Sequence, residues 1–90
     1  MKISQKKREK ISEQILATLF AVSPKSLFTS QIAQEVARDE EFIKNLLLDL
    51  KKKNFVLEIK KNSKGISYLR RLRWRLSEEV YNFYKSQQIN

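Results

Sequence analysis

The sequence contains no cysteine and no histidine, and it has only one glycine and one proline. Without cysteine there is no disulfide or thiol chemistry, and without either residue type the usual zinc sites and general-base triads cannot be assembled. There is no glycine-rich phosphate loop, and Asp39, Glu40 and Glu41 stand side by side in the sequence rather than converging on a cleft. We therefore expect a protein that is not an enzyme and that uses no metal and no cofactor.

Long apolar runs are also missing. No stretch approaches the ~20 apolar residues of a membrane-spanning helix, and the lysine-rich start leads into an amphipathic segment rather than into the apolar core of a signal peptide. These absences predict a cytoplasmic protein that makes no use of a membrane. They leave the fold and the partner to be inferred from the residues that are present.

Composition predicts a single folded domain over residues 1–90, because 41% of the residues are hydrophobic and 32% are charged. The net charge is +9, and residues 51–75 alone hold ten basic residues against one acid, Glu58. Phosphate polyanions, acidic proteins and anionic lipids are the partners that such a charge favours. The concentration of charge in one stretch indicates a localised binding surface.

The first half of the chain shows helical periodicity. Residues 9–22 carry apolar side chains at three- and four-residue spacing and predict a helix that Pro24 ends, and residues 1–8 predict a basic arm or the frayed start of that helix. After a short β-prone link, Thr29 or Ser30 is expected to cap a helix over residues 31–37. A third helix is expected over residues 39–53, capped by Asp39 and ended by Asn54 in the left-handed conformation.

The third helix divides into two faces. The side chains expected to face the core are Phe42, Ile43, Leu46, Leu47 and Leu50. Those expected to face outward are Glu41, Lys44, Asn45, Leu48, Lys51 and Lys52. The basic residues at the end of this helix have a simple alternative explanation, since a solvated lysine complements the helix dipole.

Residues 55–76 predict a β-hairpin, because apolar and polar residues alternate on both sides of a turn at residues 62–65. If Lys61 pairs with Ile66, then Phe55, Leu57 and Ile59 share the core face with Trp74 and other apolar residues of the return strand. The outer face then gathers Lys60, Arg71, Arg73 and Arg75. Three arginines on one strand face repel one another, which favours contact with nucleic acid.

A last helix is expected over residues 77–88, with Ser77 as its cap. Val80, Phe83, Tyr84 and Gln87 form one stripe along it, and Tyr81 lies off that stripe. We expect the aromatic side chains of this helix to pack against the first helix. Any part of them left exposed would form a homodimer seam between the terminal helices.

The order of these elements, together with SQIAQEVARDEEFIKNLLLDLKKKNFVLEI and YLRRLRWRLS, resembles the winged helix-turn-helix superfamily of DNA-binding domains over about residues 9–88. The resemblance implies a mainly α fold with a β-hairpin wing. It also implies a small, sequence-specific protein that binds double-stranded DNA and regulates transcription. The helix over residues 39–53 would enter the major groove, and the basic wing would contact the backbone or the minor groove.

The resemblance also assigns roles to residues. Lys44, Asn45 and Leu48 would meet base edges, and Lys51 and Lys52 would bind flanking phosphates. Ser30 and Gln31 would hold a phosphate at a helix start. The wing would contribute Lys60, Lys61, Lys64, Arg71, Arg73 and Arg75.

Three acids at the start of the proposed recognition helix, Asp39, Glu40 and Glu41, depart from this pattern. They are explained by helix capping, by recognition of cytosine amino groups, or by a protein partner in place of DNA. The alternative function is therefore a winged-helix module for protein–protein interaction, or a subunit of a larger nucleic-acid-processing assembly.

Overall fold

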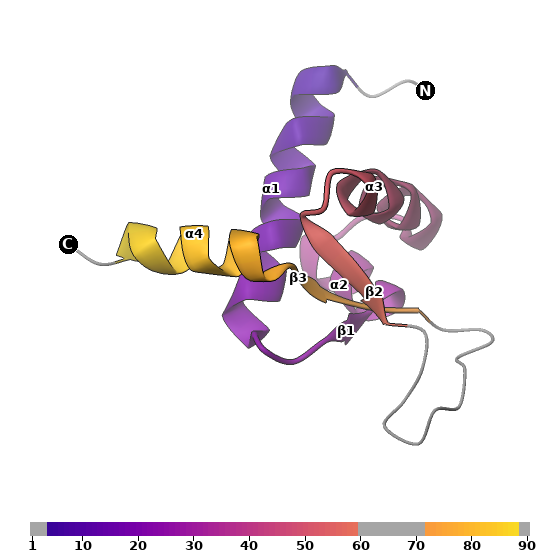
Figure 1. The fold of residues 1–90 in the computed structure, drawn as a ribbon. Helices are drawn as coiled ribbons and strands as arrows, with labels where there is room; N and C mark the ends of the chain where they lie inside the picture. The colour runs from indigo at the N-terminus through magenta and orange to yellow at the C-terminus, as the bar shows by residue number, and fades with distance from the viewer. Residues whose placement is uncertain (1–3, 60–71, 89–90) are drawn as a thin grey trace.

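The structure is a computed structural model that describes residues 4–59 and 72–88. Figure 1 shows helices gathered behind and above a small sheet, with the last helix projecting to one side. In chain order the elements are α1 (Gln5–Val22), β1 (Leu27–Phe28), α2 (Thr29–Val36), α3 (Glu40–Lys52), β2 (Val56–Ile59), β3 (Arg73–Leu76) and α4 (Glu78–Gln88). This order confirms the predicted mainly α fold with a β-hairpin. No described helix has the length and apolar character needed to cross a membrane.

Helix α1 begins earlier than predicted. The backbone N–H of Lys7 donates to the hydroxyl of Ser4 at 3.2 Å, which caps the helix, and Gln5 is its first residue. Of the two predictions for residues 1–8, the start of the helix is confirmed for residues 5–8 and the basic arm is wrong there, because Ser4 supplies the cap. At the other end Ser23 closes the helix, as Pro24 predicts, and its N–H donates to the carbonyl of Phe20 at 3.1 Å.

Helix α2 starts at Thr29, two residues before the predicted position. The cap is made by Gln31, whose side-chain oxygen accepts from the backbone N–H of Phe28 at 2.8 Å, so the predicted caps Thr29 and Ser30 are wrong. The helix ends at Ala37, which has a left-handed φ of 56° although glycine is the usual residue there. This left-handed residue allows a sharp turn into α3.

Both ends of helix α3 agree with the sequence prediction. The carboxylate of Asp39 accepts from the backbone N–H of Phe42 at 3.1 Å, and Asn54 has the predicted left-handed φ of 63°. Ile43, Leu46, Leu47 and Leu50 are buried as expected, and Phe42 is half-buried.

The sheet has the order β1-β3-β2 and is antiparallel throughout. In the described part of the hairpin Val56 pairs with Leu76 and Leu57 pairs with Arg75. Val56 is 1% exposed and Leu57 is 40% exposed, so the predicted facing of β2 is wrong. This pairing differs by an odd number of residues from the predicted one, and an odd shift reverses the faces of a strand. The predicted partners Lys61 and Ile66 lie outside the described residues.

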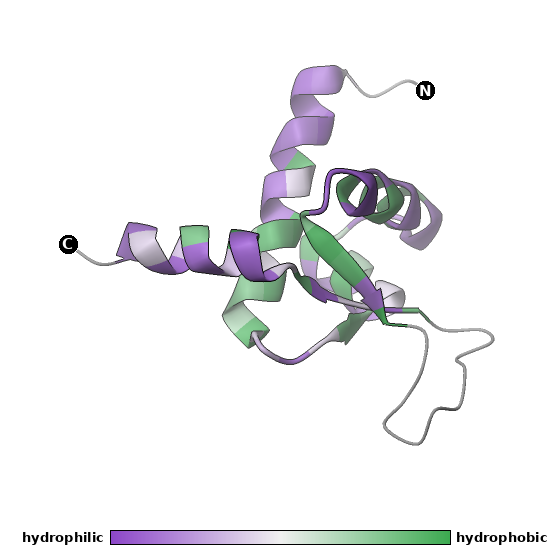
Figure 2. Cartoon of the chain, in the orientation of Figure 1, coloured by the Kyte–Doolittle hydropathy of each residue, from purple (hydrophilic) through white to green (hydrophobic). Residues whose placement is uncertain are grey.

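One hydrophobic core joins α1, α2, α3 and the inner face of the sheet. Its fully buried side chains include Ile15, Leu19, Ile32, Ile43, Leu47, Val56 and Trp74. Figure 2 shows the first turns of α1 as hydrophilic and its later turns, near the sheet and α4, as largely hydrophobic. The indole N–H of Trp74 donates to the hydroxyl of Thr29 at 2.8 Å, so the largest core side chain has its polar atom satisfied.

Helix α4 is capped by Ser77, whose hydroxyl accepts from the backbone N–H of Val80 at 3.3 Å, as predicted. Phe20 of α1 lies 5.4 Å from Tyr84 and 5.6 Å from Tyr81, measured between ring centroids. Phe83 is 61% exposed. The predicted packing against α1 is therefore confirmed for Tyr81 and Tyr84 and is wrong for Phe83, which faces outward.

Candidate nucleic-acid interface

The outward face of α3 presents Lys44, Asn45 and Lys52, all of them exposed. Burial of four leucine and isoleucine side chains against the core fixes the rotation of this helix, and so fixes which residues remain outside. Leu48 is half-buried and packs against the core, so only part of its side chain is accessible. Lys44 and Asn45 are therefore the most accessible of the predicted base-reading residues.

A groove lies between the start of α2 and the first turns of α3. Its lining residues are Phe28, Thr29, Ser30, Glu40, Glu41, Lys44 and Leu72. The fold thus brings together Ser30 and Lys44, which the sequence assigned to a phosphate contact and a base contact on separate helices. It places two glutamates in the same groove, and their negative charge opposes a phosphate there.

The start of α2 is tied to the sheet. The backbone N–H of Thr29 donates to the carbonyl of Leu72 at 3.3 Å, which anchors the helix start against the chain leading into β3. The oxygen of Gln31 is occupied by its capping bond, so a phosphate contact from Gln31 would come from its NH2 group. Ser30 is exposed in the first turn, where helix N–H groups favour an anion.

Lys51 and Lys52 have different environments despite being neighbours. The ammonium of Lys51 lies 2.9 Å from a carboxylate oxygen of Glu58, whose side chain is 7% exposed. This ion pair links the last turn of α3 to β2 and neutralises a nearly buried carboxylate. A phosphate contact from Lys51 would compete with that pair, whereas Lys52 is exposed.

Arg73 and Arg75 lie on the outer face of the sheet, which points away from the core. Trp74 and Leu76, which alternate with them along β3, are buried on the inner face. Arg75 is exposed, and the guanidinium carbon of Arg73 lies 4.6 Å from the ring centroid of Phe28. Lys25 lines a shallow groove together with Arg73 and Arg75, a contribution that the sequence did not predict. Only the pairing of β1 with β3 brings Lys25 near these arginines.

The remaining wing residues, Lys60, Lys61, Lys64 and Arg71, lie outside the described residues. Their assignment to the DNA contact stays a prediction from the sequence.

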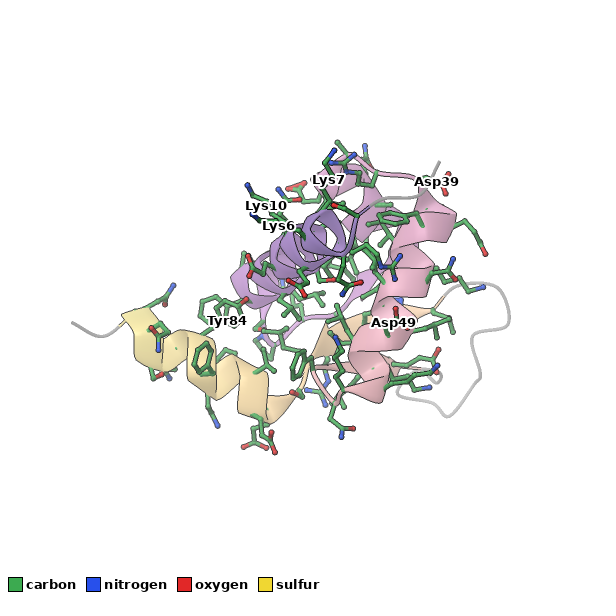
Figure 3. All side chains as sticks on the ribbon, turned by 90° about the horizontal axis from the view of Figure 1, so that it is seen from above. Lys6, Lys7, Lys10, Asp39, Asp49 and Tyr84 are labelled. Atoms are coloured by element: carbon green, nitrogen blue, oxygen red, sulfur yellow. The ribbon has the colours of Figure 1, made fainter. Side chains whose placement is uncertain are left out.

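Basic residues at the start of α1 form a separate group. Figure 3 shows Lys6, Lys7 and Lys10 on the first turns of α1, and Asp49 on α3. Between the two helices, Arg8 makes a 2.9 Å ion pair with Asp49. Arg8 therefore holds α1 against α3, and its three lysine neighbours are exposed.

Comparisons with known proteins identify the fold. No protein-family model matches the sequence, and no curated protein does. Among solved structures, a mutant of MepR from a multidrug resistant S. aureus clinical isolate superimposes with a TM-score of 0.70 at 18% identity, over 90% of this chain and 56% of MepR. The chain has the winged helix-turn-helix fold. It spans little more than half the length of that MepR chain.

Two further winged-helix structures contain DNA. The S. aureus MepR–DNA complex matches with a TM-score of 0.69 at 18% identity, over 92% of this chain and 72% of MepR. Wild-type Lactococcus lactis ZitR in complex with DNA matches with a TM-score of 0.55 at 14% identity, over 99% of this chain and 57% of ZitR. In the winged-helix arrangement α2 and α3 form the helix-turn-helix, and β2 and β3 flank the wing.

Proposed function

We propose that this protein binds double-stranded DNA and regulates transcription, with α3 in the major groove. The observation that carries the proposal is the exposure of Lys44 and Asn45 on α3. MepR and ZitR, which share this fold, have been solved in complex with DNA. The amide of Asn45 can pair in bidentate fashion with adenine, and Lys44 can donate to guanine. Leu48 offers the accessible part of its side chain to a thymine methyl group.

Phosphate contacts would position the duplex around this helix. Lys52 would bind a phosphate beside α3, and Ser30 and Gln31 would bind one at the start of α2. The basic wing would add Lys60, Lys61, Lys64 and Arg71. Arg73 and Arg75, which the resemblance assigned to the wing contact, lie on the outer face of the sheet and are not needed for the contact made by α3.

Glu40 and Glu41 restrict where DNA can approach. Both line the groove beside Ser30 and Lys44, so a phosphate in that groove would meet two carboxylates. Their role in a DNA-binding protein would be to accept hydrogen bonds from cytosine amino groups. The same two glutamates favour the alternative function, a winged-helix module that binds a protein through α3.

A homodimer formed through the terminal helices is part of the proposal. Phe83 is 61% exposed on α4 and makes an edge contact with Tyr84, at 6.0 Å between centroids. Pairing of α4 with a second copy would cover this ring. Light scattering of the protein and of its Phe83→Ser variant tests the dimer, which the substitution should convert to monomer.

The test of DNA binding is fluorescence anisotropy of a labelled mixed-sequence duplex at two salt concentrations. With about five phosphates neutralised, the affinity should fall roughly 10²- to 10³-fold between roughly 50 and 200 mM salt. A labelled single strand of the same sequence serves as the control for duplex preference. Absence of duplex binding at the lower salt would overturn the proposal and favour the protein-binding alternative.

A further inference from the structure

We propose that the outer face of the sheet is a docking site for an acidic peptide segment with one bulky apolar side chain. Its described lining residues differ from those of the groove beside α3. It consists of two adjoining hollows that share Pro24 and Arg75, and we call the pair the outer furrow. One hollow is mostly apolar and the other is basic.

The apolar hollow lies between the end of α1, the strands and the start of α4. It is lined by Ser23, Pro24, Leu57, Leu76, Glu78 and Tyr81, together with the shared Arg75. Leu57 is 40% exposed because the hairpin pairing turns it away from the core, so its exposure follows from the fold and leaves an apolar surface beside the half-buried Tyr81. An apolar side chain of a partner would remove this surface from water.

The basic hollow is lined, among the described residues, by Lys25, Arg73 and Arg75 together with Pro24, Ser26 and Ile59, none of which is acidic. The ring of Phe28, 4.6 Å from the guanidinium carbon of Arg73, holds that side chain in place. A guanidinium group that is already positioned loses less conformational entropy when it binds a carboxylate.

The spacing of the arginines fits an extended peptide. Arg73 and Arg75 are two residues apart on one strand, so their side chains emerge about 7 Å apart on the same face. Alternate residues of an extended peptide have the same spacing, so two acidic side chains can each meet one arginine. Leu57 pairs directly with Arg75, which places the apolar contact next to the end of the basic row.

An acidic peptide fits the outer furrow better than a nucleic acid does. A phosphate backbone would use the arginines and Lys25, and it would leave Leu57 and Tyr81 without an apolar partner. The outer face is also the opposite side of the sheet from α3, because Val56, Trp74 and Leu76 are buried in the core that contains the inner side chains of α3. The basic hollow and the apolar hollow together therefore fit a ligand that carries both negative charge and an apolar side chain.

The test uses fluorescence polarisation of a labelled peptide that has one phenylalanine followed by a run of aspartates. A matched peptide carries asparagines in place of the aspartates. The wild-type protein should bind the acidic peptide and should bind the matched peptide at least about tenfold more weakly. Failure of the protein to bind the acidic peptide would overturn the proposal.

Two variants locate the binding. Arg75→Glu and Leu57→Asp should each weaken the acidic peptide at least about tenfold, whereas Lys10→Glu, which reverses a charge on α1, should change it less than about twofold. Equal losses for Arg75→Glu and Lys10→Glu would mean general attraction to a basic protein and would overturn the proposal. Thermal unfolding of each variant verifies that it is folded.

DNA titrations separate this site from the α3 surface. Leu57→Asp should bind the labelled duplex as the wild type does, and an excess of duplex should leave the bound peptide in place. If the duplex displaces the peptide, or if Leu57→Asp loses the duplex as well, the outer furrow belongs to the nucleic-acid surface and the peptide site is excluded. Because the peptide assay contains no DNA, its result does not depend on whether the α3 surface binds a duplex.

Discussion

The indole N–H of Trp74 donates to the hydroxyl of Thr29 across 45 positions of sequence, at 2.8 Å and inside the core. It connects the central strand of the sheet to the first residue of α2. Both residues are nearly or fully buried, with Trp74 at 0% and Thr29 at 7% exposure. This bond therefore fixes the start of the helix-turn-helix relative to the wing.

Thr29→Val should lower the free energy of unfolding by about 1–3 kcal/mol, because it keeps the shape of the side chain and leaves the buried indole N–H without its acceptor. Urea denaturation measures the change. In the Trp74→Phe background, which has no indole N–H, the same substitution should cost less. An equal cost in both backgrounds would show that the hydrogen bond contributes nothing to stability.

Lys51→Ala should destabilise the protein by about 1–2 kcal/mol, because it removes an ammonium group that lies 2.9 Å from the nearly buried carboxylate of Glu58. Lys52→Ala is the matched comparison, since Lys52 is exposed on the same helix turn, and its stability should change by less than about 0.5 kcal/mol. Urea denaturation of both variants decides the matter. Equal free energies of unfolding for the two variants would show that the ion pair between Lys51 and Glu58 contributes nothing to stability.

Asn45→Ala should cost roughly 1–3 kcal/mol of binding free energy on the preferred DNA sequence and little on others, because an amide that reads a base carries sequence information. Lys52→Ala should weaken all sequences alike, because a phosphate contact carries none. Anisotropy titrations with a selected site and a scrambled site measure both. A uniform loss for Asn45→Ala would remove its base-reading role.

Stability should decrease in alkali as Tyr84 ionises. Burial, and secondarily the negative charge of Glu13, raises the pKa of Tyr84 above its ordinary value of 10.0. The folded state therefore holds the phenolic proton more tightly than the unfolded state does. The resulting stability is present below pH 10 and is lost as the pH rises through the raised pKa of the folded state.

Urea denaturation at several alkaline pH values measures this dependence, and Tyr84→Phe should reduce it. Absorbance titration of the phenolate should show one fewer high-pKa tyrosine in that variant. A Tyr84→Phe protein with the same alkaline dependence as the wild type would assign the effect to other groups.

Local chemistry made much of the fold predictable from the sequence. Asp39 and Ser77 cap helices because their side-chain oxygens accept from N–H groups three residues on, and Asn54 ends α3 because it tolerates a positive φ. The inward leucines of α3 follow from helix periodicity alone. Lys44, Asn45 and Lys52 lie on the exposed face for the same local reason.

Contacts between distant segments decided the rest. The facing of β2 depends on hairpin pairing, which a shift of an odd number of residues reverses, so Val56 rather than Leu57 entered the core. Glu58 met Lys51, and Lys25 came near Arg73 and Arg75, because of how the strands pack and pair. The sequence by itself determined the presence of the helices, the caps Asp39 and Ser77 and the exposed residues of α3, since these depend on neighbours within a few positions. Only the tertiary structure decided the strand faces, the ion pairs and the outer furrow, since these depend on pairing across the whole chain.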